Sequence, residues 1–199
     1  TDAFLTGGYP ENNLVQVEAL RYLYLNNIHV TPVYDSLGRR EGLRLLVVGD
    51  YLERNTRLQM ILLERSAAIL PTDMMITVKP HLACPILPED YPELRLKIAI
   101  EPLIDLLGEC DIVYSSATTT AGLDAFCFGV PVITLLDPTI LNMSPLRGYA
   151  GTFFVSTPDE LIHALNIARP SHLITKMRTD VFTLNRELSL WRQLLDGTC

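Results

Sequence analysis

The chain has 199 residues, of which 48% are hydrophobic and 20% are charged. This balance is typical of one globular domain with a substantial core, and it excludes an intrinsically disordered chain. The net charge of -7 makes the surface as a whole repel polyanions, so we expect no nucleic acid partner. A phosphate-bearing ligand stays compatible with this charge, because backbone N–H groups and a few basic side chains can hold an anion locally.

The cysteine pattern and the hydropathy predict a soluble, cytoplasmic protein. Cys84, Cys110, Cys127 and Cys199 form no Cys-x-x-Cys pair and have no histidine at zinc-finger spacing, which fits a reducing cytoplasm. No apolar run approaches the ~20 residues of a transmembrane segment, and no secretory leader opens the chain. Because the sequence starts at Thr1 rather than at Met, we expect a fragment of a longer protein.

The first 42 residues predict a helix followed by a linker. Apolar side chains over 14–26 recur on one helical face, with Asn12 or Asn13 as a cap. The stretch 31–42 is polar and contains proline and glycine, as exposed loops do. We divide the chain into 1–42, helix and linker; 43–170, the main domain; and 171–199, an extension with a helix over 184–195.

The middle of the chain alternates apolar, β-rich runs with helical patterns. Expected strands cover 43–48, 74–78, 96–100, 111–114, 132–136 and 152–155, and helical patterns cover 58–69, 102–107, 121–128 and 161–168. This alternation predicts an α/β fold, a Rossmann-like open parallel sheet of about six strands with helices on both faces. Ligands of such sheets bind at the carboxyl ends of the strands, near the topological switch point, so we expect the functional side chains there.

A run of hydroxyl side chains follows the fourth expected strand. The segment 115–120, Ser-Ser-Ala-Thr-Thr-Thr, carries five hydroxyls in six residues and precedes an expected helix. A helix start offers unpaired N–H groups and the positive end of the helix dipole, to which hydroxyls add neutral donors. Capping is the alternative role, but one cap needs only one hydroxyl. We predict phosphate binding by Ser115, Ser116, Thr118 and Thr119.

Basic side chains follow the second expected strand. Lys79 can neutralise a phosphate, and His81 can donate a hydrogen bond or a proton to it. Pro80 stiffens the turn between them. A structural role is the alternative for His81, and its coincidence with the hydroxyl run favours the functional one. We predict His81 as the catalytic residue and Lys79 as a phosphate ligand.

Three further residues end strands and are candidates for the nucleoside part of a ligand. Glu101 follows the third expected strand, where one carboxylate can accept from both vicinal hydroxyls of a ribose, as in dinucleotide sites. The alternative for Glu101 is an acidic residue favoured by a helix dipole. Gly49 and Asp50 close the first expected strand. We predict that Glu101, Gly49 and Asp50 contact ribose or base.

The signatures of several other α/β proteins do not occur in the sequence. It has no G-x-G-x-x-G after a strand, no Walker A lysine and no G-x-S-x-G elbow. This disfavours dinucleotide oxidoreductases, P-loop nucleotidases and α/β-hydrolases. It also has no Asp-x-Asp pair, so we expect neither a metal nor another cofactor.

The segment 124–131 resembles a signature of a known enzyme family. Its Asp-Ala-x-x-x-Gly-x-Pro pattern resembles the acidic-Ala-x-x-x-Gly-x-Pro motif in the C-terminal domain of GT-B glycosyltransferases, and Gly129 suits the left-handed position that ends a helix. The resemblance covers most of 43–168. It implies the nucleotide-sugar-binding half of a two-domain enzyme, whose missing N-terminal domain carries the acceptor site and the catalytic base.

Three motifs are similar to those of bacterial sialyltransferases and polysialyltransferases within the GT-B enzymes: Lys-x-His at 79–81, Ile-Glu-x-Leu at 100–103 and Val-x-Ser-Ser at 113–116. The resemblance implies that the histidine and both serines contact phosphate, that the glutamate contacts ribose, and that the donor is a CMP-sugar bound without metal. Leu82 stands where that family usually has proline. The implied function is sugar transfer in the synthesis of a surface polysaccharide or glycan.

Two alternatives to this function stay open. A UDP-sugar-using GT-B enzyme, such as a UDP-GlcNAc epimerase-like protein, would share the fold and a hydroxyl-rich phosphate loop, and nucleotide preference would separate it from a CMP-sugar enzyme. A non-catalytic nucleotide-binding or assembly module would keep the sheet without turnover.

Overall fold

The computed structural model describes residues 2–27, 42–142, 144–168 and 181–197. The chain divides into two compact units. Thr1–His29 and Lys176–Cys199 form one, called here the terminal unit, and Val30–Thr175 forms the other, called the sheet unit. The predicted linker lies outside the described residues except for Gly42. The predicted boundaries at 42 and 170 border undescribed residues and stay predictions.

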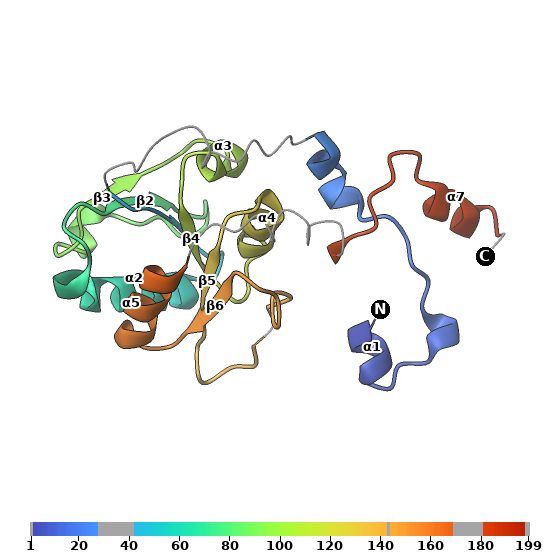
Figure 1. The fold of residues 1–199 in the computed structure, drawn as a ribbon, viewed down its shortest axis with the longest axis horizontal. Helices are drawn as coiled ribbons and strands as arrows, with labels where there is room; N and C mark the ends of the chain where they lie inside the picture. Colours follow the sequence, from blue (N-terminus) through green and yellow to red (C-terminus); the bar gives the residue numbers. More distant parts are fainter. Residues whose placement is uncertain (1, 28–41, 143, 169–180, 198–199) are drawn as a thin grey trace. The chain divides into compact units, whose positions relative to one another are not determined.

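A six-stranded parallel sheet forms the centre of the sheet unit, as predicted (Figure 1). The strands are β1 (Arg44–Val48), β2 (Met75–Lys79), β3 (Leu96–Ile98), β4 (Ile112–Ser116), β5 (Val132–Leu135) and β6 (Thr152–Val155). Their order is β3-β2-β1-β4-β5-β6, and every neighbouring pair is parallel. The chain builds outward from β1 to β3 and then restarts beside β1 with β4. The topological switch point therefore lies between β1 and β4.

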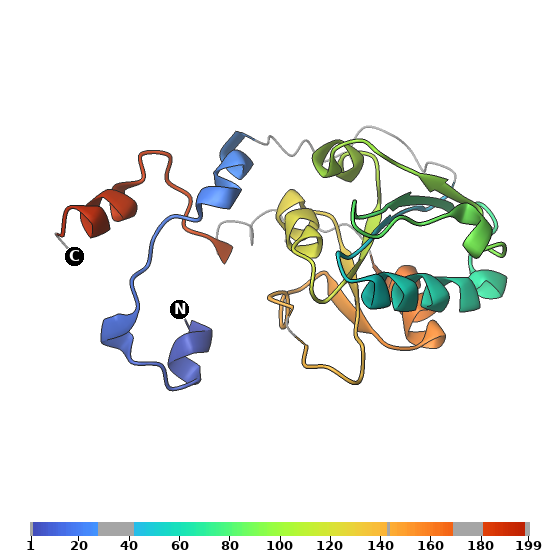
Figure 2. The same ribbon diagram turned by 180° about the vertical axis from the view of Figure 1, so that it is seen from behind.

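Helices cover both faces of this sheet, as predicted (Figures 1 and 2). The helices α2 (Glu53–Arg65) and α5 (Pro158–Ile167) pack together on one face, and α3 (Leu103–Leu107) and α4 (Ala121–Phe128) lie on the other. The short 3-10 helices η3 (Ala67–Ile69) and η4 (Pro88–Asp90) precede and follow β2.

Alternating side chains of the strands build the core beneath these helices. Val47, Tyr114 and Ile133 occupy one row across β1, β4 and β5 and are fully buried together with Leu161 of α5. Gly129 ends α4 with a φ of 91°, the left-handed conformation that the sequence predicts for it. The core thus fixes β1 against β4, the two strands that flank the switch point.

The described elements of the terminal unit include α1 (Asp2–Thr6), η1 (Glu11–Asn13), η2 (Leu20–Asn27) and α7 (Ser189–Leu195). The predicted helix over 14–26 is wrong for 14–19, which is not helical. Tertiary contacts explain the difference, because the N–H of Ala19 donates to the carbonyl of Thr183 at 3.0 Å. In an α-helix that N–H would bond four residues back along the chain.

The start of α7 is held by a residue from the opposite end of the sequence. The carboxylate of Glu18 accepts from the N–H groups of Leu190 and Trp191 at 2.8 and 3.0 Å. The predicted helix over 184–195 is therefore too long, since α7 begins only after Leu188, whose φ is 52°.

Among the described residues, no helix is both long and apolar enough to cross a membrane.

Candidate functional site

Polar side chains gather at the switch point, where the carboxyl ends of β1 and β4 meet. Asp50 follows β1, Ser116 ends β4, Thr118 lies in the turn before α4, and Asn55 lies on the first turn of α2. We call these four residues the Asp50 cluster. Because β1 and β4 pair directly, the loops that carry them are neighbours. This is the edge at which the sequence predicts the functional residues.

The carboxylate of Asp50 fastens these loops together. Asp50 is 0% exposed, and its Oδ2 accepts from the hydroxyls of Ser116 and Thr118 and from Nδ2 of Asn55, the last at 3.0 Å. Its Oδ1 accepts from the N–H of Leu52 at 3.0 Å. The amide of Asn55 also donates to Oγ1 of Thr118 at 2.7 Å. One carboxylate therefore joins segments from β1, β4 and α2.

These hydrogen bonds keep Asp50 ionised. Burial alone would raise the pKa of Asp50, but bonds from Ser116, Thr118, the Leu52 N–H and Asn55 stabilise the anion and lower the pKa overall. An ionised carboxylate only accepts hydrogen bonds. Asp50 has no exposed surface in this conformation, and its predicted contact with ribose or base stays a prediction.

The two serines of the hydroxyl run point to opposite faces of β4, as consecutive strand residues do. Ser116 faces Asp50, whereas Ser115 is 0% exposed and lies under α4, where a Cβ added to Gly122 would lie 2.7 Å from its Oγ. The Oγ of Ser115 has no hydrogen-bond partner among the described residues. The structure thus brings Ser116 and Thr118 together and leaves Ser115 outside the cluster.

Thr119 lies at the start of α4, where the sequence predicts an anion cradle. Its hydroxyl accepts from the N–H of Ala121 at 3.3 Å. The helix α4 starts directly after Thr120, and the first turn of a helix presents N–H groups that its own backbone does not bond. Thr119 is half-buried and Thr120 is exposed, whereas Ala121 and Gly122 of the first turn are buried.

The predicted basic residues follow β2, which is the other neighbour of β1. The N–H of Gly49 donates to the carbonyl of Lys79 at 2.9 Å, and a Cβ on Gly49 would lie 3.2 Å from the backbone nitrogen of His81. Gly49 thus has a structural reason for its lack of a side chain. His81 is exposed, its Nδ1 accepts from the N–H of Ala83 at 3.1 Å, and its ring meets Tyr51 edge-on. A neutral His81 therefore carries its proton on Nε2.

Glu101 lies apart from the Asp50 cluster. It follows the edge strand β3, with β2 and β1 between it and β4, a separation of about 14 Å at the usual strand spacing. Its Oε2 accepts from the N–H of Ile100 at 2.9 Å. Bonds from its own N–H and from Ile100, with Lys97 and Lys79 nearby, outweigh partial desolvation and lower the pKa of Glu101. An ionised Glu101 can accept from ligand hydroxyls, as predicted for ribose.

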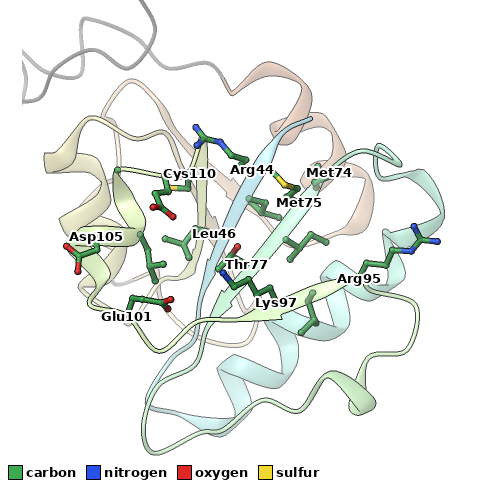
Figure 3. A pocket seen from close by; sticks show the side chains of 16 residues that line it. Arg44, Leu46, Met74, Met75, Thr77, Arg95, Lys97, Glu101, Asp105 and Cys110 are labelled. Atoms are coloured by element: carbon green, nitrogen blue, oxygen red, sulfur yellow. The ribbon is translucent and has the colours of Figure 1, made fainter. Parts of the chain in front are cut away.

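A cavity of about 890 Å³ opens beside Glu101 on the α3 face of the sheet (Figure 3). Leu46 of β1 and Met75 and Thr77 of β2 line it, and Lys97 and Glu101 carry opposite charges beside one another at its side. Among the described helices, only the five-residue helix α3 contributes side chains to this cavity. The cavity therefore gives a ligand access to Glu101 without access to the Asp50 cluster.

An ion pair at the carboxyl end of β5 is missing from the sequence-based prediction. Arg54, in the first turn of α2, contacts Oδ2 of Asp137 and Oγ1 of Thr139 at 2.7 and 2.9 Å. Bonds from the hydroxyl and N–H of Thr139, together with Arg54, outweigh burial and lower the pKa of Asp137. Asp137 follows β5, so the rule that selected the other strand ends could have found it. Arg54 adds a guanidinium to the edge.

The sheet and its helices match one Rossmann-like half of the GT-B fold, which confirms the predicted fold class. Among the described residues, no group of three or more His, Cys, Asp or Glu side chains is placed to hold a metal ion. No protein-family model and no curated protein matches the sequence.

Solved structures of similar fold include two glycosyltransferases and an epimerase. SnogD, a glycosyltransferase from Streptomyces nogalater, gives a TM-score of 0.57 at 15% identity, over 85% of this chain and 46% of SnogD. The UDP-GlcNAc 2-epimerase of Methanocaldococcus jannaschii, solved with UDP-GlcNAc and UDP, gives a TM-score of 0.57 at 18% identity. The match covers 99% of this chain and 58% of the epimerase. AviGT4, a glycosyltransferase involved in avilamycin A biosynthesis, gives a TM-score of 0.52 at 16% identity. The match covers 83% of this chain and 54% of AviGT4.

These similarities establish the fold alone. The chain spans about half the length of the three proteins, 46% to 58%. The rest of each protein, 42% to 54% of its length, lies beyond the matched region. The predicted resemblance to sialyltransferases is finer than this fold similarity and stays a prediction.

Proposed function

We propose that this chain is the donor-binding half of a glycosyltransferase, which transfers a sugar from a nucleotide sugar during synthesis of a glycan or surface polysaccharide. The observation that carries the proposal is the convergence of β1, β2 and β4 on one edge, where they end in hydroxyl, carboxylate, ammonium and imidazole groups. A nucleotide sugar needs cationic or N–H donors for its phosphate and acceptors for its hydroxyls. This edge offers both kinds of group in a GT-B-like fold.

The phosphate of the donor binds between the β2 loop and the start of α4. The strands β2 and β4 flank β1, so their ends lie roughly 10 Å apart. Lys79 and His81 on one side, and Thr119 with the first-turn N–H groups of α4 on the other, can contact one phosphate across this gap. The location at a helix start also supplies the favourable end of the helix dipole.

His81 stabilises the leaving nucleotide in this proposal. Because the N–H of Ala83 occupies Nδ1, the Nε2 proton of His81 is free to be donated to a phosphate oxygen. Negative charge grows on that oxygen as the bond to the sugar breaks, and a donor placed there is worth more in the transition state than in the ground state. Positioned donors take the role that a metal has in other transferases, so the proposal includes neither a metal nor another cofactor.

A CMP-sugar is the favoured donor. The support is the ordered set of Lys-x-His at 79–81, Glu101 and the hydroxyls after β4, which resembles sialyltransferases and polysialyltransferases. Cytosine carries an amino donor at N4 where uracil carries a carbonyl acceptor at O4, so a site built for one leaves a polar group unpaired with the other. The glutamate contacts the ribose and does not decide between the bases.

The other half of the enzyme supplies the acceptor site and the catalytic base. The chain spans 46% and 54% of two similar glycosyltransferases, which supports a whole enzyme with a further domain. A cytoplasmic location belongs to the same proposal, because the cysteine pattern of the sequence fits a reducing compartment. This chain alone should show no glycosyl transfer, since positioning and proton transfer are divided between two domains.

Metal-free calorimetric titration of the chain with CMP, UMP, GMP and AMP tests the proposal. CMP should bind most tightly, by one to two decades over UMP if a single buried polar group is left unpaired by the wrong base. His81→Ala should weaken CMP binding about tenfold. The matched control is His163→Ala, which removes an exposed histidine from α5.

The outcome separates three classes of protein. Tighter binding of UMP than of CMP would reject the CMP-sugar donor and favour the UDP-sugar alternative, which the similarity to a UDP-GlcNAc 2-epimerase supports. Failure of the wild-type chain to bind any of the four nucleotides would leave the non-catalytic assembly module. Equal effects of the two histidine variants would remove His81 from the phosphate site.

A further inference from the structure

In the Asp50 cluster, the direction of hydrogen-bond donation by the two hydroxyl groups is fixed. A serine or threonine hydroxyl has one proton to donate and two lone pairs with which to accept. Both Ser116 and Thr118 donate that proton to Oδ2 of Asp50. Thr118 also accepts from Nδ2 of Asn55 at 2.7 Å, which leaves it one lone pair and no proton for a ligand.

This direction disfavours phosphate, the ligand predicted for Ser116 and Thr118 from the sequence. Phosphate oxygens carry lone pairs and negative charge, so they need donors, and the protons of both hydroxyls are already committed. The ionised carboxylate of Asp50 lies directly behind the hydroxyls and repels a second anion. A ligand group that itself donates a hydrogen bond meets neither obstacle.

We propose that Thr118, oriented by Asp50 and Asn55, binds a sugar hydroxyl of the nucleotide sugar by accepting its proton, and that the phosphate is bound only by the neighbouring donors at Lys79, His81 and the start of α4. This inference rests on the proposed function, because it names the part of the same ligand that the cluster binds. Thr118 is the contact residue and Asp50 is a positioning residue.

Exposure selects Thr118 rather than Ser116 for the contact. Ser116 is 4% exposed and lies inward along β4, whereas Thr118 is half-buried in the turn that leads to exposed Thr120 before α4. Ser116 lies 3.3 Å from Thr118 and shares the same carboxylate oxygen, so it fills the space behind Thr118. A ligand hydroxyl beside α4 would therefore reach Thr118 first, while the adjacent helix start holds the phosphate.

Thr118→Val is the direct test, since it removes the acceptor and keeps the shape of the side chain. The affinities of the 199-residue chain are measured for cytidine, CMP, CMP lacking its 2′- or 3′-hydroxyl, and CMP-N-acetylneuraminate. Thr72→Val is the matched control, because it makes the same change on exposed Thr72 before β2, outside both the cluster and the cavity beside Glu101. Circular dichroism shows whether each variant is folded.

Loss of about fivefold to tenfold for cytidine and CMP alike, with no loss for one deoxy form, supports a ribose hydroxyl as the group bound. That result would reject the predicted contact of Glu101 with the same ribose, because Glu101 follows β3, with β2 and β1 between it and β4. Loss confined to CMP-N-acetylneuraminate supports a hydroxyl of the transferred sugar. Loss for CMP without loss for cytidine shows a phosphate contact and overturns the inference, as does an unchanged affinity for every ligand. Absence of any binding by the wild-type chain rejects the proposed function itself.

Asp50→Asn provides a second test, the ratio of CMP to cytidine affinity, which would not change if Asp50 had only a structural role. The neutral amide removes the repulsion of phosphate and can donate to one hydroxyl, which releases that hydroxyl's proton for a ligand. The ratio of CMP to cytidine affinity should therefore rise, by about fivefold to tenfold. An unchanged or lower ratio in a folded variant counts against the orientation of the cluster by Asp50.

Discussion

Replacing Asp50 also tests whether one carboxylate holds the switch point together. Asp50→Ala removes the acceptor of bonds from Ser116, Thr118, Asn55 and Leu52. The two hydroxyls can then bond each other across 3.3 Å, and the exposed Leu52 can bond water. Each donor that stays buried without its partner costs about 1–3 kcal/mol. We expect the free energy of unfolding to fall by about 2–4 kcal/mol, and by about 1–2 kcal/mol for Asp50→Asn.

The effect has a defined pH dependence. The folded pKa of Asp50 is lowered, so its anion stabilises the fold fully above the unfolded pKa of about 3.9. That contribution is lost as the pH falls through the still lower folded pKa. The difference in stability between the wild type and Asp50→Asn should stay constant from about pH 7 to pH 5 and shrink below about pH 4.

Urea denaturation followed by far-UV circular dichroism measures these differences. Tryptophan emission would not serve, because Trp191 is the only tryptophan and lies in the terminal unit. Asp159→Asn is the control, since Asp159 is exposed in the first turn of α5 and should change the stability by less than about 1 kcal/mol. Equal stability of Asp50→Ala and the wild type at pH 7, or a difference that persists undiminished at pH 3, would refute the reasoning.

Two further predictions concern packing under α4 and the terminal unit. Gly122→Ala should lower the free energy of unfolding by about 1–2 kcal/mol despite the better helix propensity of alanine, because its Cβ would lie 2.7 Å from Oγ of Ser115. The loss should largely disappear in a Ser115→Ala background, and an equal loss in both backgrounds would contradict the contact. Glu18→Ala should shift the emission of Trp191, whose N–H bonds the Glu18 carboxylate at 3.0 Å and whose indole bonds its carbonyl at 2.8 Å. Glu11→Ala changes an exposed glutamate of the same unit and should leave the emission unchanged. Unchanged emission in Glu18→Ala would show that the start of α7 does not depend on Glu18.

The sheet could be predicted from the sequence because each strand is a short apolar run, and the parallel fold buries such runs on both faces. The hydroxyl run shows where this reasoning ends. The sequence pattern predicts that the fourth strand ends at Tyr114. Ser115 and Ser116 are therefore expected side by side in the loop that follows. The strand β4 continues to Ser116, so the alternation of strand side chains sends the two serines to opposite faces.

Long-range contacts account for the parts that the sequence does not reveal. Asp50 and Ser116 are 66 residues apart, and no local pattern indicates that they share a hydrogen bond. The same holds for Glu18 and Trp191, which are 173 residues apart and whose contact replaces a helix that local periodicity favours. Periodicity reports which side of an element is apolar, whereas the partner of a polar group depends on the register of distant elements.

The burial of Asp50 is itself an argument for a role in ligand binding. Its Oδ1 bonds the N–H of Leu52 and thereby shapes the turn into α2, a task that a neutral asparagine oxygen would perform with a smaller desolvation cost. Its Oδ2 orients the hydroxyls of Ser116 and Thr118, which a neutral amide would leave free to turn. Only the second task requires the charge. Beyond its contribution to stability, the ionised carboxylate therefore suits a site that must tell the hydroxyls of its ligand from the adjacent phosphate.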